Sequence, residues 1–175
     1  MVCGSTFTMT GESQVKVRRA TPNDLQILGG YGGKLARQHR AYNPQRFTLF
    51  EPVEREFAQF YGEQLSRQDA VILVAELEGR VVGYMFVRVE PESFADALAA
   101  AAWIHDIYVD ESWRGRRVGA LLMDAAIESA RELGSRCVML SVAVQNEGAR
   151  SVFERHGFRV TMQEMRLDVA EDVER

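Results

Sequence analysis

Alternating apolar and polar positions predict a series of strands. Apolar and charged residues alternate near the start of the chain, and two β-rich runs flank a glycine turn at Glu78-Gly79, as in a hairpin. A nearly continuous apolar run that starts at Cys137 indicates a central strand buried on both faces. The expected strands are Val15–Arg19, Val71–Leu77, Arg80–Val89, Trp103–Val109, Cys137–Val144, and one or two closing strands within Phe158–Val169.

Apolar residues at helical spacing predict helices between these strands. The helix that follows Thr21-Pro22-Asn23-Asp24 contains four glycines between Gly29 and Gly33, each of which costs roughly 1 kcal/mol in a helix. We therefore expect a break or bend near Tyr31. The other helices are expected over Glu51–Leu65, Gly119–Leu133 and Glu147–His156.

This order of elements predicts an α/β (α+β) fold, with a mixed sheet that carries helices on both faces. No internal repeat, low-complexity tract or linker divides the chain. We therefore interpret residues 15–175 as a single domain and residues 1–14, which are rich in small residues, as a flexible N-terminal leader.

The composition narrows the class of protein. Hydrophobic residues make up 46% and charged residues 26% of the 175 residues, which excludes disorder as the main state. The net charge is 21 − 25 = −4, whereas general nucleic-acid-binding domains are strongly basic. No apolar run reaches the roughly 18 residues of a membrane span, and two cysteines do not make a disulfide framework. We expect a cytoplasmic protein that binds neither nucleic acid nor membrane.

The clearest chemistry lies where an expected strand meets an expected helix. This segment reads Tyr108-Val109-Asp110-Glu111-Ser112-Trp113-Arg114-Gly115-Arg116-Arg117-Val118-Gly119-Ala120. Glycines let backbone N–H groups turn towards an anion, the helix dipole favours negative charge there, and three arginines suit a polyphosphate. The segment has neither the Gly-Lys-Ser/Thr ending of a nucleoside triphosphate loop nor the Gly-x-Gly-x-x-Gly of dinucleotide folds. By composition alone, a solvated basic turn explains it equally well.

Three segments resemble the GCN5-related N-acetyltransferase (GNAT) superfamily. Ile104–Val109 with Trp113–Leu122 resembles its acetyl-CoA-binding segment, Asn146–Phe158 its second CoA segment, and Val17–Asp24 its first strand and helix start. The resemblance covers nearly all of Val15–Val169, in the expected order. It implies a mostly antiparallel mixed sheet of about six to seven strands with a V-shaped splay between two central strands. It also implies acetyl-CoA as co-substrate, without a metal.

The resemblance implies which residues bind acetyl-CoA. The main chain of Ile107, Tyr108 and Val109 would pair with the pantetheine arm like an added strand. Arg117 stands where the family usually has its first glycine, so this position needs negative φ or carries strain. Backbone amides around the basic loop would hold the pyrophosphate, and three later residues complete the site: Arg114, Gly115, Arg116, Arg117, Val118, Gly119, Ala120, then Asn146, Ala149 and Phe153.

His105 is the first candidate for the catalytic base, with Asp106 in reserve. The amine must lose a proton before it attacks, and family members often carry the base on this stretch of strand. Strand alternation places His105 on one face with Ile107 and Val109, towards the cofactor, and Asp106 on the opposite face. The alternative is that His105 only hydrogen-bonds within the sheet.

The proton donor for the departing thiolate is missing from its usual place. Family members usually have a tyrosine where this chain has Phe153, which cannot donate a proton and is interpreted as a core residue. Tyr108 or Ser151 is the candidate substitute. Otherwise the thiolate leaves unassisted, which neutral pH tolerates because a free thiol has a pKa of about 8.5.

In this family the acceptor usually lies against the first two helices and neighbouring loops. Acidic residues before the third long strand could attract a cationic amine or form a solvated loop: Glu90, Glu92 and Asp96. The candidate acceptor-binding residues are aromatic or histidine side chains, a set that equally fits a core: Tyr31, His39, Tyr42 and Phe47, with Phe50 and Tyr61 nearby.

These features predict transfer of an acetyl group from acetyl-CoA to a primary amine of a small molecule, by direct attack in a ternary complex. The alternative is a CoA-binding sensor or scaffold with little catalytic activity, which Phe153 favours. The resemblance to the family also implies a homodimer. The identity of the acceptor and the length of the acyl chain stay open.

Overall fold

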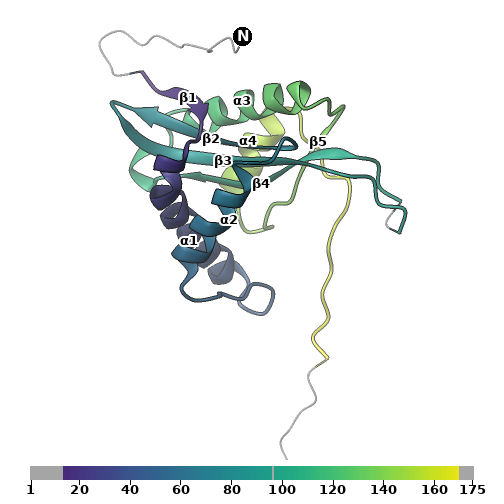
Figure 1. Ribbon diagram of the computed structural model, residues 1–175. Coiled ribbons are helices and arrows are strands. Elements are labelled where there is room, and N and C mark those ends of the chain that lie inside the picture. The colour runs from purple at the N-terminus through teal and green to yellow at the C-terminus, as the bar shows by residue number, and fades with distance from the viewer. Residues whose placement is uncertain (1–13, 96, 170–175) are drawn as a thin grey trace, which may run out of the picture.

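A five-stranded sheet forms the centre of the computed structural model, which describes residues 14–95 and 97–169 (Figure 1). Neighbouring strands are antiparallel except β4 and β5, which are parallel. The mixed, mostly antiparallel sheet is thus confirmed, with five strands in the described residues instead of six to seven. The strands lie in chain order: β1 (Lys16–Arg19), β2 (Ala70–Leu77), β3 (Arg80–Glu90), β4 (Ala101–Val109) and β5 (Val138–Leu140).

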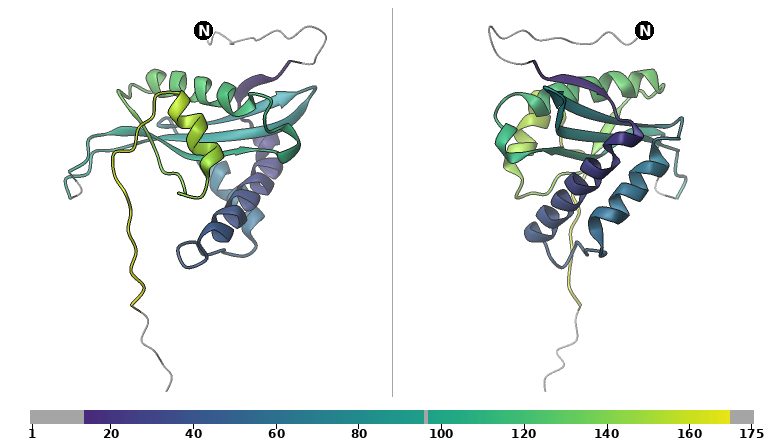
Figure 2. Two further views of the ribbon diagram at one scale, coloured as in Figure 1. Left: turned by 180° about the vertical axis from the view of Figure 1, so that it is seen from behind. Right: turned by 60° about the vertical axis from the view of Figure 1, so that its left-hand side comes forward.

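Two helices cover each face of the sheet, as expected (Figure 2). One face carries α1 (Leu25–Tyr42) and α2 (Val53–Gln64), and the other carries α3 (Val118–Glu132) and α4 (Glu147–Arg155). None of these helices combines the length and apolar content needed to cross a bilayer. The leader expected at residues 1–14, apart from Gln14, lies outside the described residues, as does Asp96.

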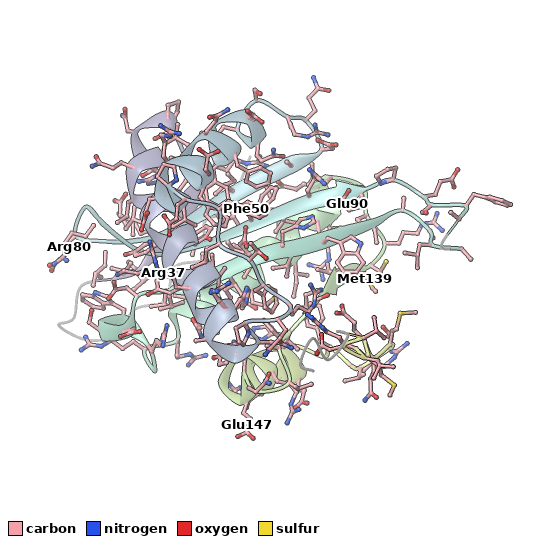
Figure 3. All side chains as sticks on the ribbon, turned by 90° about the horizontal axis from the view of Figure 1, so that it is seen from below. Arg37, Phe50, Arg80, Glu90, Met139 and Glu147 are labelled. Atoms are coloured by element: carbon pink, nitrogen blue, oxygen red, sulfur yellow. The ribbon has the colours of Figure 1, made fainter. Side chains whose placement is uncertain are left out.

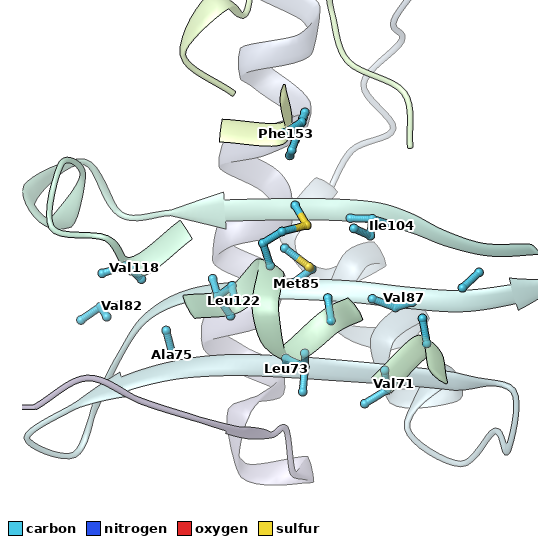
Figure 4. Packing of buried hydrophobic residues seen from close by; sticks show 14 of the residues in the cluster. Val71, Leu73, Ala75, Val82, Met85, Val87, Ile104, Val118, Leu122 and Phe153 are labelled. Atoms are coloured by element: carbon cyan, nitrogen blue, oxygen red, sulfur yellow. The ribbon is translucent and has the colours of Figure 1, made fainter. Parts of the chain in front are cut away.

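β3 divides its side chains between two hydrophobic cores, because successive residues of a strand point to opposite faces. Met85 packs with Leu122 of α3 and Phe153 of α4 (Figure 4). On the other face, Phe86 packs with Tyr61 of α2. The core beneath α1 and α2 is therefore rich in aromatic rings, and the candidate catalytic side chains His105 and Asp106 border it.

α1 runs without interruption through its glycine-rich segment, so the expected break near Tyr31 is wrong. The glycines lie where α1 meets α2. A Cβ on Gly29 would lie 2.4 Å from the Glu54 carbonyl oxygen, and one on Gly32 would lie 2.6 Å from Cγ of Phe57. The missing side chains let the two helices pack closely, and this packing offsets the low helix propensity of glycine.

β5 is shorter and more exposed than the sequence predicts. Only Val138–Leu140 forms a strand, its side chains are half-buried, and Cys137 is exposed. Phe158–Val169 forms no strand, so the expected closing strands are absent from the described residues. Without them β5 is the edge of the sheet, and the prediction of a strand buried on both faces is wrong for that reason.

Candidate functional site

A β-bulge in β4 places two candidate residues on the same face of the sheet. Phe86 pairs with Asp106 and Val87 with Ile104, so His105 has no partner across the ladder. The His105 ring stacks on Phe86, with ring centroids 5.2 Å apart, and thus lies on the face that α1 and α2 cover. A bulge puts two residues opposite one and interrupts alternation.

The predicted face of His105 is corrected accordingly, whereas Asp106 lies, as predicted, on the face opposite Ile107 and Val109. Asp106 accepts a hydrogen bond from Tyr61, which belongs to the core beneath α1 and α2. Ile107 and Val109 pack on the opposite core, beneath α3 and α4. His105 therefore shares its face with Asp106, and the expectation that it shares a face with Ile107 and Val109 is wrong.

His105 belongs to a small charged cluster on the surface of the sheet. Its Nε2 lies 2.8 Å from Oε1 of Glu90, which also accepts a hydrogen bond of 2.8 Å from Nε of Arg88. The side chain of His105 is 34% exposed. Figure 3 shows this face of the molecule, with Glu90 on β3 and Phe50 close to the two helices.

Asp106 ends a chain of three hydrogen-bonded side chains. The Tyr61 hydroxyl donates to Oδ2 of Asp106 at 3.0 Å, and the Tyr61 and Tyr84 hydroxyls lie 2.7 Å apart. Because Tyr61 has one proton and gives it to Asp106, Tyr84 must donate to Tyr61. Burial raises the pKa of Asp106 above its ordinary value, while the hydrogen bond from Tyr61 acts in the opposite direction. Burial also raises the pKa of both phenols.

A pocket of about 400 Å³ opens beside Asp106, between α1, α2 and the segment that joins them. His39 and Phe47, two of the predicted acceptor-binding residues, line it, and their rings stack with centroids 5.0 Å apart. Tyr31 lies in the core, where its hydroxyl donates to the Val81 carbonyl at 2.9 Å. Tyr42 accepts a hydrogen bond from Gln38 and is not among the lining residues.

One edge of β4 lacks a strand neighbour beyond the bulge. The β4–β5 ladder covers only Ala102, Trp103 and Ile104. From Asp106 to Val109, β4 pairs with β3 on one side, and within the described residues no strand pairs with it on the other. An extended ligand can pair with such an edge through main-chain hydrogen bonds.

The basic loop after β4 leads to the N-terminus of α3. The first internal bond of α3 runs from the Leu121 N–H to the Arg117 carbonyl, so the amides of Val118, Gly119 and Ala120 have no acceptor within the helix. Gly115 has φ 75° and Arg117 has φ 63°. Of the two options expected for Arg117, the structure thus has the left-handed, strained conformation.

Two arginines of this loop, Arg114 and Arg116, lie over aromatic rings of the preceding segment. Arg114 donates from Nε to the Val109 carbonyl at 3.1 Å, and its guanidinium lies 5.6 Å from the centre of the Tyr108 ring. The guanidinium of Arg116 lies 4.8 Å from the Trp113 ring. These contacts hold two cations near the positive end of the α3 dipole, where an anion is favoured.

α4 presents the remaining predicted residues. Asn146 caps the helix, with its Oδ1 accepting from the Ala149 N–H at 3.2 Å. Phe153 is buried in the core beneath α3 and α4, as expected of a core residue. Tyr108 lies on the opposite face of the sheet, and burial raises the pKa of its phenol.

Sequence reasoning passed over Tyr84, which completes the hydrogen-bonded chain to Asp106. A usable signal was present, because Tyr84 is a hydroxyl-bearing residue within an otherwise apolar stretch of β3. A buried tyrosine hydroxyl normally requires a hydrogen-bond partner. That requirement predicts a polar neighbour, although it does not say which one.

Known proteins resemble this chain in sequence and in fold. The model of the Acetyltransferase (GNAT) family matches residues 35–158. An uncharacterised N-acetyltransferase of Methanocaldococcus jannaschii is 35% identical over 143 residues, which are 81% of this chain and 59% of that protein. This chain therefore spans about three fifths of the relative's length.

Solved structures below 25% identity agree in fold. A Bacillus halodurans structure superposes with a TM-score of 0.78 at 20% identity, over 88% of this chain and 99% of that chain. An aminoglycoside N-acetyltransferase in complex with CoA gives a TM-score of 0.70 at 15% identity, over 92% and 98% of the respective chains.

Proposed function

Since the chain belongs to the GNAT family of acetyltransferases, we propose that it transfers an acetyl group from acetyl-CoA to a primary amine of a small molecule by direct attack while both substrates are bound. One juxtaposition carries this proposal. The open edge of β4 begins at the bulge where Asp106 faces the pocket between α1 and α2. A thioester laid along that edge and an amine in that pocket would meet beside Asp106.

The loop after β4 fits the pyrophosphate of acetyl-CoA. A Cβ on Gly115 would have nothing within 4 Å, and one on Gly119 would meet only Val109 Cγ2 at 3.9 Å, so a ligand can approach the backbone closely. The amides that begin α3 and the loop arginines supply donors and positive charge. The proposed cofactor-binding residues are Ile107, Tyr108, Val109, Arg114, Gly115, Arg116, Arg117, Val118, Gly119, Ala120, Asn146, Ala149 and Phe153.

Asp106 is the base that the geometry supports best. It lines the pocket, whereas His105 is not among the lining residues and is hydrogen-bonded to Glu90. A raised carboxylate pKa lies closer to neutral pH, where a general base is most effective. His105 is the second candidate, because it shares the face and is partly exposed.

Acetyl-CoA would supply a thioester, and the acceptor would supply a primary amine that arrives as an ammonium ion. The acceptor ammonium gives one proton to Asp106, which passes it to solvent. A bond then forms between the amine nitrogen and the acetyl carbonyl carbon while the carbon–sulfur bond breaks. The nitrogen loses its second proton to solvent, and solvent returns a proton to the group that protonates the departing sulfur. Tyr108 is the proposed donor to the sulfur, because it lies on the same face of β4 as Asp106 and a phenol is protonated at neutral pH.

A calorimetric titration of acetyl-CoA into the wild type tests the cofactor site. We expect micromolar binding that is lost when Arg114→Ala is combined with Gly119→Trp, whereas Arg131→Ala at the other end of α3 binds normally. No binding to the wild type would refute the proposal. Measuring the release of the CoA thiol in the presence of amines then distinguishes an acetyltransferase from a CoA-binding protein without catalytic activity. Binding without turnover on any amine would favour the CoA-binding sensor or scaffold, which Phe153 supports because a phenyl ring cannot protonate sulfur.

Within the same proposal the enzyme is a cytoplasmic homodimer. Met165, Leu167 and Val169 alternate with Arg166 and Asp168 as on a strand. All three apolar side chains are more than four fifths exposed, on a segment that extends away from the sheet (Figure 1). The outer edge of β5 has no strand neighbour within the described residues. We propose that this segment pairs with β5 of a second copy of the chain.

Light scattering after gel filtration measures the oligomeric state. The wild type should be dimeric, and Met165→Asp combined with Leu167→Asp should be monomeric. Phe94→Asp, which changes an exposed apolar residue elsewhere, should remain dimeric. A monomeric wild type would contradict the dimer.

A further inference from the structure

We infer that the acceptor is a small monoamine whose amine is attached to an aromatic or branched apolar group. This inference rests on the proposed function and adds the chemistry of the acceptor. It follows from three properties of the pocket beside Asp106: its apolar walls, the charges of its lining residues, and the positions of Asp106 and the phenylalanines within it.

The walls of the pocket are predominantly apolar. α1 contributes Leu35, α2 contributes Phe57 and Phe60, and the connecting segment contributes Phe47 and Phe50. Phe60 is 37% exposed and Phe50 is 73% exposed, so both offer apolar surface that a ligand can cover. Covering such surface removes it from water and thereby stabilises a complex. A sugar or an extended polyamine has too little apolar surface to use these walls.

The charges that line the pocket are negative. Its acidic side chains are Asp106 and Glu56, and none of the described lining residues is lysine or arginine. Burial, together with the charge of Arg46, lowers the pKa of His39, so this imidazole is neutral at neutral pH. A cationic amine is therefore attracted to these carboxylates, whereas a phosphorylated acceptor would find no cation among the described lining residues. The two arginines next to Phe47 are already engaged, Arg40 with the Phe47 carbonyl and Arg46 with Glu164.

The order of these features orients the acceptor. Asp106 lies on the sheet, at the start of the open edge of β4, whereas Phe50 lies on the exposed segment between α1 and α2. The ammonium group would therefore point inward to Asp106, with the apolar group against Phe47 and Phe50. A second ammonium group on the same small molecule would lie against phenyl rings, where it loses hydration. The other carboxylate of the described lining, Glu56, is already paired with Arg55 at 3.2 Å.

A comparison of kcat/KM between amines tests the inference. The probes are 2-phenylethylamine, 3-methylbutylamine, spermidine and kanamycin, with thiol release measured at saturating acetyl-CoA. We expect kcat/KM for the two monoamines to exceed that for spermidine and kanamycin at least about tenfold, which corresponds to roughly 1.4 kcal/mol of transition-state stabilisation. Calorimetric titration of 2-phenylethylamine into the CoA-saturated protein provides a readout that is independent of turnover.

Two exposed phenylalanines give matched variants. Phe50→Ala removes apolar surface from the pocket and should weaken 2-phenylethylamine binding several-fold. Phe94→Ala removes a fully exposed ring on the β3–β4 connection, outside the pocket, and should leave the affinity unchanged. Both side chains are exposed, so neither substitution should unfold the chain.

The outcomes distinguish failure of the inferred acceptor class from failure of the proposed acetyltransferase function. Preference for spermidine or kanamycin would overturn the inference and leave the acetyltransferase function intact. Preference for a peptide with N-terminal phenylalanine over 2-phenylethylamine would also overturn it, because the acceptor would then be a protein terminus. Equal weakening by Phe50→Ala and Phe94→Ala would place the acceptor elsewhere. Failure of acetyl-CoA itself to bind would instead refute the proposed function.

Discussion

The hydroxyl of Tyr61 on α2 donates a hydrogen bond of 3.0 Å to Oδ2 of Asp106 on β4. This bond connects a helix that lines the proposed acceptor pocket with the strand that carries the proposed base. It is supported from behind by Tyr84, whose hydroxyl lies 2.7 Å from that of Tyr61. The protonation of Asp106 is therefore coupled to the packing of α2 on the sheet.

Tyr61→Phe should move the acidic limb of the profile of kcat/KM against pH to higher pH. The Tyr61 hydrogen bond lowers the pKa of Asp106, so its removal lets burial raise that pKa further. Activity requires the carboxylate and would appear only at higher pH. Tyr84→Phe also removes one buried hydroxyl but leaves the bond to Asp106 in place, so its profile should shift less. An unchanged acidic limb in Tyr61→Phe would exclude Asp106 as the base.

Asp106→Asn should reduce turnover by about a hundredfold or more, the usual contribution of a general base, and yet stabilise the fold at neutral pH. Because the folded pKa is raised, the folded chain binds this proton more tightly than the unfolded chain does. Wild-type stability is therefore lost as pH rises from the ordinary aspartate value of about 3.9 through the folded pKa. Thermal unfolding should show a larger gain for the variant at about pH 7.5 than at about pH 4. The same gain at both pH values would contradict this account.

His105→Ala separates the two candidate bases. If Asp106 accepts the proton, His105→Ala retains most of the turnover and the same acidic limb, and acetyl-CoA affinity is unchanged. The side chain stacks on Phe86 and is partly exposed, so its loss should cost little stability. Loss of turnover with a flattened pH profile would instead identify His105 as the base.

Gly29→Ala and Gly30→Ala should change stability in opposite directions. A methyl group on Gly29 would lie 2.4 Å from a backbone oxygen of α2, so α1 and α2 must move apart, at a cost of about 1–3 kcal/mol. A methyl group on Gly30 would have nothing within 4 Å, so the variant should gain about 0.5–1 kcal/mol from helix propensity. Urea unfolding measures both free energies. Equal effects would show that the α1–α2 contact does not require glycine.

Arg117→Gly should stabilise the chain by about 1 kcal/mol, because φ 63° is costly for a residue with a Cβ and not for glycine. Arg116→Gly is the matched control. It removes one arginine from the same loop without relieving a positive φ, and it loses the contact with Trp113. Denaturant unfolding of both variants isolates the backbone contribution. A loss of stability in Arg117→Gly would mean that its side-chain contacts outweigh the strain.

Local sequence determined most of the elements and the basic turn into α3. The spacing of apolar residues placed α2, α3 and α4 within a few residues of their observed bounds, because one helix face must be buried. The run from Trp113 to Ala120 identified the basic turn into α3, since glycine, arginine and a helix start are neighbours in the chain. That information is carried by residues a few positions apart.

Tertiary structure decided what depends on partners distant in the chain. The glycines of α1 predicted a break. The helix continues instead, because its close contact with α2 leaves no room for a side chain at Gly29 or Gly32. Cys137–Val144 predicted a buried strand, but β5 lies at an edge because no closing strand covers it in the described residues. The bulge at His105 places this side chain on the face opposite to the one that strand alternation predicts, because the pairing with β3 sets the register of β4. Alternation along a strand is a local rule, whereas register is a property of two strands together, so only the folded sheet brings His105 and Asp106 to one side.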